Sequence, residues 1–114
     1  MVNNNLEKEI LNIENMTERI KKMKYVLSKM YVYGESGAGL VKVKMNGEKN
    51  LVKLKIDRSI MKEDKLVLEN LIIKAINIAN KKADIEINSE IVKTMKEIGI
   101  PKKFISMFPL IGSN

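Results

Sequence analysis

The feature that most constrains the fold is a stretch of alternating apolar and polar residues that contains two glycine-bearing turns. It spans residues 34–56 and contains Gly37-Ala38-Gly39 and Asn46-Gly47. Asn-Gly is the preferred pair of a two-residue type I′ turn, in which both residues have positive φ. We therefore expect a β-hairpin folded at Asn46-Gly47, in which Lys44 lies opposite Lys49.

Side chains alternate between the two faces of such a hairpin. One face is expected to be apolar and collects Val41, Val43, Met45, Val52, Leu54 and Ile56. The other face collects Lys42, Lys44, Lys49, Lys53 and Lys55, with Leu51 among them. Like charges opposite each other destabilise a sheet. A face of one sign therefore indicates a polyanion as partner.

The segments around the hairpin predict an α+β fold. Residues 6–30 contain no Gly or Pro, and their apolar residues recur at steps of three or four, which predicts one long helix. At 1.5 Å per residue this helix would be about 35–40 Å long, so part of it should project beyond the core. Tyr31-Val32-Tyr33 begins a further strand, and residues 31–57 are expected to form a three-stranded antiparallel meander.

A second long helical region is expected over residues 64–98, with Asp64 as its N-cap. It either continues or restarts at Ser89, and Gly99-Ile100-Pro101 ends it. Its apolar face is wide enough to pack against the sheet on one side and a partner subunit on the other. Residues 99–114 form a tail, either a flexible end or an apolar strap. The whole chain, 1–114, is expected to be one domain.

The composition narrows the function. The net charge is +7, which favours nucleic acid or an anionic membrane surface as partner. A/T-rich codons could alone account for the abundant lysine, but less well for its uneven placement. The chain has no His, Cys or Trp, which excludes Ser-His and Cys-His nucleophile pairs and His/Cys zinc sites. We therefore expect no enzyme, cofactor or metal, and no membrane span, because no apolar run approaches the required length.

The residues resemble a known family. The run from Gly34 to Val43, then Met45-Asn46-Gly47, Ile56-Asp57 and Leu71-Ile72 are similar to the YbaB/EbfC nucleoid-associated proteins of bacteria. The resemblance covers essentially the whole chain and is strongest over residues 31–80. It implies a tweezer-like homodimer that binds double-stranded DNA in the cytoplasm and nucleoid, without a small-molecule substrate.

DNA-binding residues are expected in two places. The hairpin contributes Lys42, Lys44, Lys53 and Lys55. The resemblance implies helical arms, and because residues 1–18 are acidic, we place the arm contacts short of the tips, at Arg19, Lys21, Lys22, Lys24, Lys81 and Lys82. With two arginines and few aromatic residues, base reading and base stacking are both expected to be weak.

Two alternatives stay open. The amphipathic first helix could instead recruit a protein partner, which would make the chain an interaction module with solubilising lysines. A binder of anionic membranes is a weaker alternative, because the helices lack interfacial aromatic residues.

Overall fold

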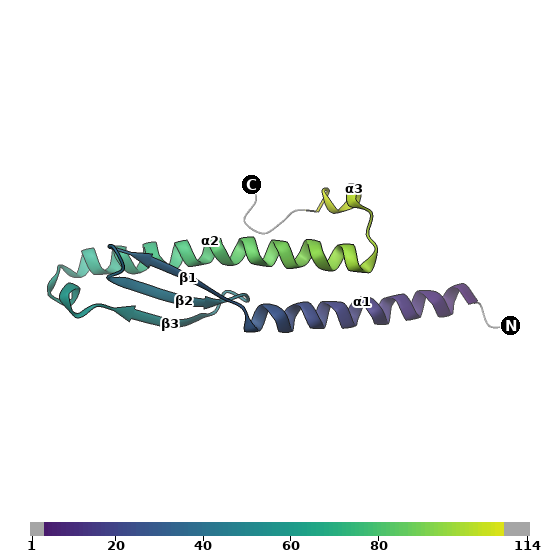
Figure 1. The fold of residues 1–114 in the computed structure, drawn as a ribbon, viewed down its shortest axis with the longest axis horizontal. Coiled ribbons are helices and arrows are strands. Elements are labelled where there is room, and N and C mark those ends of the chain that lie inside the picture. Colours follow the sequence, from purple (N-terminus) through teal and green to yellow (C-terminus); the bar gives the residue numbers. More distant parts are fainter. Residues whose placement is uncertain (1–3, 109–114) are drawn as a thin grey trace.

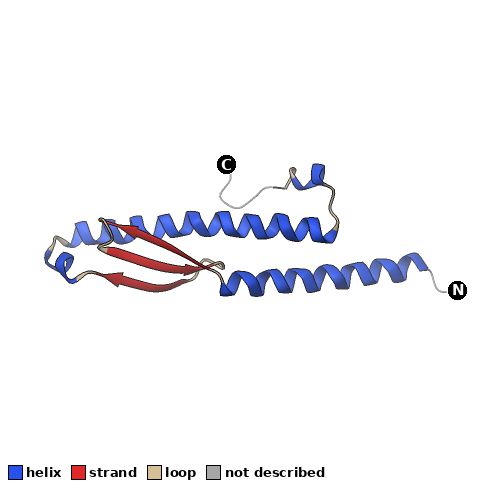
Figure 2. Cartoon of the chain, viewed as in Figure 1, coloured by secondary structure: helices blue, strands red, loops and turns tan. Residues whose placement is uncertain are grey.

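A three-stranded antiparallel sheet and two long helices make up the computed structural model, which describes residues 4–108 (Figures 1 and 2). The elements in chain order are α1 (Asn4–Lys29), β1 (Tyr31–Ser36), β2 (Val41–Asn46), β3 (Leu51–Ile56), the 3-10 helix η1 (Arg58–Lys62), α2 (Lys65–Ile98) and α3 (Lys102–Ile105). The strand order is β1-β2-β3. The predicted α+β class and meander are confirmed. The molecule is elongated, with extents of 77 × 25 × 17 Å.

Small residues allow α2 to lie directly on β1. On the helix, Ala75, Ala79 and Ala83 are fully buried. On the strand, a Cβ added at Gly34 would lie 2.8 Å from the backbone nitrogen of Ala79 and closer still to the carbonyl oxygen of Ala75. The buried Ser36 hydroxyl donates a 2.6 Å hydrogen bond to the carbonyl of Leu71. The glycine at position 34 therefore serves helix packing rather than a turn.

The core lies between α2 and the inner faces of β1 and β2. Its buried residues are Val32, Val41, Val43, Met45, Ala75, Ala79 and Ala83. The first predicted turn is confirmed, because Gly37, Ala38 and Gly39 all have positive φ. These three residues reverse the chain between β1 and β2.

The predicted type I′ turn at Asn46-Gly47 is wrong. Positive φ occurs at Lys49 instead, and β2 and β3 are joined by residues 47–50. The Asn46 side chain accepts hydrogen bonds from the backbone nitrogens of Glu48 and Asn50, at 2.9 and 3.0 Å. Gly47 donates its backbone N–H to the carbonyl of Leu27 at 2.9 Å, so its missing Cβ allows the loop to meet the end of α1.

The longer loop also changes the register. Lys44 lies opposite Lys53, not Lys49, and a bulge follows at Lys44/Met45. Lys49 leaves the lysine face and forms an ion pair with Asp84 of α2. The lysine stripe expected from the sequence therefore keeps four of its five members.

The apolar side chains of β3 are not covered in this single chain. Leu51, Val52 and Leu54 are 44%, 51% and 42% exposed. Leu54 shares the inner face with its cross-strand neighbour Val43, which is buried. The difference arises because α2 packs across β1 and β2 and does not cover β3.

Both long helices follow their sequence signals closely. The Asp64 side chain caps α2 by accepting from the backbone nitrogen of Leu66 at 3.2 Å, and α2 then runs unbroken for 34 residues to Gly99. Ser89 is not a new cap. The start of α1 extends past the end of α2 (Figure 1), and the structure confirms that this helix projects from the core.

The tail turns back at Pro101 into the short helix α3, whose Ile105 is buried. Residues 109–114, the rest of the predicted tail, lie outside the described residues. Among the described residues, no helix is long and apolar enough to cross a membrane.

Candidate nucleic-acid interface

The outer face of the sheet gathers four of the predicted residues. Cross-strand pairing places Lys42 opposite Lys55 and Lys44 opposite Lys53. We call these four residues the sheet lysines. Their inner neighbours Val41, Val43 and Met45 are buried, so the strand alternation turns the lysines outward. They line a shallow depression of about 280 Å³ together with Tyr33.

Little opposite charge balances this face. Glu35 of β1 lies across from Lys42 and is the one acidic residue among the described strands. Like charges placed opposite each other repel, which costs folding stability. A bound polyanion would relieve this repulsion, because each phosphate can sit between ammonium groups. The lysine face is therefore more stable with a phosphate backbone bound to it than without a ligand.

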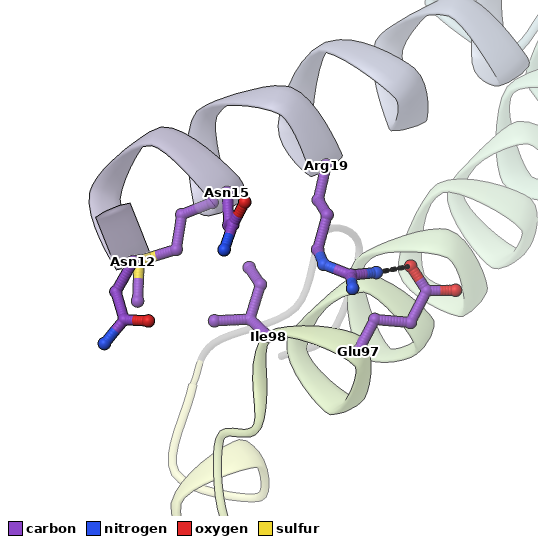
Figure 3. Close-up of a pocket in the computed structure, with 6 residues that line it drawn as sticks. Asn12, Asn15, Arg19, Glu97 and Ile98 are labelled. Atoms are coloured by element: carbon purple, nitrogen blue, oxygen red, sulfur yellow. Dashed lines mark hydrogen bonds and ion pairs between the residues drawn. The ribbon is translucent and has the colours of Figure 1, made fainter. Parts of the chain in front are cut away.

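The predicted arm residues do not form one surface. Arg19 faces α2, where its Nη1 lies 3.3 Å from the Glu97 carboxylate, beside a pocket of about 190 Å³ lined by Asn12, Asn15 and Ile98 (Figure 3). Lys22 lines the neighbouring part of the same helix contact, together with Glu90. Lys22 therefore lies near the carboxylates of Glu90 and Glu97 as well as near other cationic side chains.

Lys21 and Lys24 are exposed, and Lys21 lies 3.8 Å from Glu18 on its own helix. Exposed ion pairs such as Arg19–Glu97 and Lys21–Glu18 contribute only about 0–1 kcal/mol, so a phosphate could displace either carboxylate. Arg19 and Lys21 are thus partly neutralised by carboxylates, whereas the acidic residue of the strands, Glu35, lies across from Lys42 alone among the sheet lysines.

Lys81 and Lys82 are exposed on α2 directly before the buried Ala83. Ala83 packs in the core with the sheet, so these two lysines lie near the middle of the helix rather than at its far tip. The ten predicted residues therefore fall into three groups: sheet lysines, α1 cations and the α2 pair.

Sequence reasoning gave no site role to the exposed tyrosines of β1. The ring of Tyr31 lies beneath Lys44, with 4.1 Å from the Nζ atom to the ring centroid. Tyr33 lies directly across from Lys44. A strand with tyrosines two residues apart carries both on one face, and that spacing was the signal available in the sequence.

The described residues hold no group of three or more side chains able to bind a metal ion. The acidic residue with a displaced pKa is Asp57, before η1. The hydroxyl of Ser59 and then its backbone N–H donate to this carboxylate and hold its pKa below the ordinary value. This carboxylate caps η1, which is a structural role.

Comparison with known proteins agrees with a DNA-binding assignment. Residues 3–98 match the model of the YbaB/EbfC DNA-binding family. A nucleoid-associated protein of Francisella philomiragia is 43% identical over 100 residues, covering 87% of this chain and 90% of that protein. One from Francisella tularensis is 41% identical over 101 residues, with the same coverage. The crystal structure of the uncharacterized protein HP0035 from Helicobacter pylori shares the fold, with a TM-score of 0.70, 22% identity and coverage of 83% and 99%.

Proposed function

The chain belongs to the YbaB/EbfC DNA-binding family, and we propose that it is a homodimeric nucleoid-associated protein that holds duplex DNA through phosphate contacts. The observation that carries this proposal is the gathering of the four sheet lysines on one face beside a single carboxylate. Lysine acts as a point charge and lacks the planar fork that reads guanine, so sequence preference should be low. The protein would act in the nucleoid, organising DNA and thereby influencing gene expression.

Phosphate contacts predict a steep dependence on salt. Each neutralised phosphate releases counterions, and log affinity falls with log salt at about −0.9 per contact. Four sheet lysines on one chain therefore predict a slope of about −3.6, and a dimer that uses both sheets about −7. A mobility-shift titration against unrelated duplexes at several salt concentrations measures both the slope and the sequence preference.

Neutral substitutions locate the surface. The double variant Lys53→Gln/Lys55→Gln removes two contacts, so the slope should shrink by about 1.8 per chain. Lys102→Gln/Lys103→Gln on α3 is the matched control, because it removes the same charge from an exposed site at the other end of α2. Lys81→Gln/Lys82→Gln tests the α2 pair in the same way. Salt-insensitive binding, or an equal loss in the α3 control, would reject the sheet as the contact surface.

The uncovered apolar side chains support the dimer. On β3 they include Leu54, and on α2 they include Leu66, Val67 and Ile73, which are 61%, 44% and 55% exposed. Large exposed apolar surface typically marks a protein–protein interface. A second copy would cover β3 where α2 does not reach, and would leave the lysine face of each sheet open.

The dimer has its own test. Light scattering during gel filtration should give twice the chain mass of 13.0 kDa for the parent, and the single-chain mass for Leu54→Glu. Leu11→Glu is a control of the same chemistry, because Leu11 is 57% exposed on α1 and distant from β3 in sequence and fold. A dimeric Leu54→Glu variant would refute this interface.

A second candidate function rests on the part of α1 that extends past α2. Leu6, Ile10 and Ile13, in the first half of α1, are 52%, 49% and 61% exposed, which favours a protein-interaction module. Replacing Ile10 and Ile13 by Ser separates the two functions. The interaction module would be favoured if the parent retains a stoichiometric protein partner after nuclease treatment and the variant loses it. The variant should then still bind duplex DNA as the parent does.

A further inference from the structure

Tyrosines are concentrated on the face that carries the sheet lysines. The chain has three tyrosines, and two of them, Tyr31 and Tyr33, lie on the outer face of β1. They are 43% and 58% exposed, although aromatic rings normally contribute to a core. The strand alternation buries Val32, Gly34 and Ser36 instead.

The strand register places one tyrosine among the lysines. Tyr33 pairs with Lys44, and Lys44 pairs with Lys53, so one row crosses all three strands. The next row contains Glu35, Lys42 and Lys55. The shallow depression on this face is lined by Tyr33 and all four sheet lysines. An aromatic ring therefore lies beside ammonium groups on a flat, open surface.

The two rings differ in what covers them. Lys44 lies over the ring of Tyr31, which holds that ammonium group by a cation–π contact. Among the described residues, the rings that lie beneath a cation are those of Tyr25, Tyr31 and Phe104. The ring of Tyr33 is thus left open for another flat group.

We propose that this face binds single-stranded nucleic acid, with an unpaired base stacked on Tyr33 and the adjoining phosphates held by the sheet lysines. The bases of a duplex are stacked inside the helix, so a duplex can use the lysines but offers nothing to the ring. A single strand exposes both its bases and its phosphates. Sheets that present aromatic rings beside basic residues bind such strands through this combination. The inference rests on the proposed function in that nucleic acid is the ligand.

Fluorescence anisotropy tests this with labelled oligothymidylate, oligouridylate and a short duplex, each titrated with the full chain. Loss of one stacked base weakens binding by about 5- to 150-fold, so Tyr33→Ala should weaken single-strand binding by that factor. Tyr33→Phe keeps the ring and should bind like the parent. Tyr25→Ala is the matched control, because Tyr25 is 65% exposed on α1. Tyr33→Ala should leave the affinity for the duplex unchanged.

Tyrosine emission gives an independent reading of the same contact, since the chain contains no tryptophan. A base stacked on Tyr33 should quench this emission, and Tyr33→Phe should lose part of the quenching while keeping its affinity. Comparing the affinities for oligothymidylate and oligouridylate shows whether the preferred strand is DNA or RNA. A preference for either strand that depends on Tyr33 supports the proposal.

Several results would overturn it. These are undetectable single-strand binding by the parent, an unchanged single-strand affinity in Tyr33→Ala, and an equal loss of single-strand and duplex affinity in that variant. Each of them leaves duplex binding by the parent, and hence the proposed function, intact. Conversely, Tyr33-dependent binding of single strands by a parent that does not bind duplex would refute the proposed function and support this inference.

Discussion

Gly34→Ala should destabilise the protein strongly, because the added methyl group meets helix backbone. The new Cβ would lie 2.8 Å from the Ala79 nitrogen and 3.1 Å from the Ala79 Cβ, and would also contact the Ala75 carbonyl oxygen. Ordinary contacts between such atoms are about 3.5–4.0 Å. Relief therefore requires α2 to retreat from β1 by about 1 Å at this point, and a helix backbone cannot rotate away as a side chain can.

Overpacking of a core costs typically about 1–3 kcal/mol, and we expect the upper part of this range because the obstruction is backbone. Alanine also lowers the conformational entropy of the unfolded chain, which offsets about 0.4–1 kcal/mol of this cost. The net loss is therefore about 1.5–2.5 kcal/mol. The unfolding entropy of a chain of 114 residues is about 0.24 kcal/mol/K, so the melting temperature should fall by about 6–10 °C.

Circular dichroism melts at one fixed protein concentration measure this change, since the melting temperature of the proposed dimer would depend on concentration. Gly99→Ala is an informative comparison, because Gly99 has a φ of 94° and no atom within 4 Å of an added Cβ. Its loss reports conformational strain alone, about 1–2 kcal/mol. A second variant, Gly34→Ala/Ala79→Gly, removes only the Cβ of Ala79 and should not restore stability.

A fall of less than about 4 °C for Gly34→Ala would refute the tight contact between α2 and β1, because it corresponds to about 1 kcal/mol. Full rescue by Ala79→Gly would show that the side chain, not the backbone, is the obstruction.

Three further predictions concern loops and helix ends. Gly47→Ala places a Cβ 2.9 Å from Leu27 Cα and should lower the unfolding free energy by about 1–3 kcal/mol in denaturant titrations, with an unaffected midpoint contradicting the docking of this loop on α1. Asp64→Ala removes the cap of α2 and should cost about 1 kcal/mol by the same titration, whereas Asp64→Asn should retain most of it. Asp57 has a lowered pKa in the folded state, so its contribution is present above the unfolded pKa of about 3.9 and is lost as pH falls through the folded pKa. The difference in melting temperature between the parent and Asp57→Asn should therefore narrow on acidification, and a constant difference would argue against the Ser59 hydrogen bonds.

The elements were predictable because their signals are local. The helical spacing over residues 6–30, the Asp64 cap and the glycine after Ile98 each act within a few neighbouring residues, and each is found in the structure. The turn at Asn46-Gly47 was not predictable in this way. Gly47 meets Leu27, a contact between residues distant in sequence, and the local Asn-Gly signal carries no information on such a contact.

The candidate site shows the same limit. Strand alternation correctly predicted that the sheet lysines share a face, but not that α2 would leave the inner side of β3 uncovered. The low number of aromatic residues led us to expect weak base stacking. Whether a ring can stack on a base depends on where it lies, and Tyr33 lies exposed on the lysine face. Which of the lysines contact DNA stays a prediction.

The stripe of Ala75, Ala79 and Ala83 has a mechanical consequence. It clamps the first half of α2 to the sheet, and the helix then continues from Ala83 to Ile98, a length of about 22 Å at 1.5 Å per residue. A tilt of about 10° at the clamp would swing the far end by about 4 Å, which approaches one helical turn of 5.4 Å. A ligand that slightly changes the tilt of α2 where it packs on the sheet would therefore produce a larger displacement at the far end of the helix.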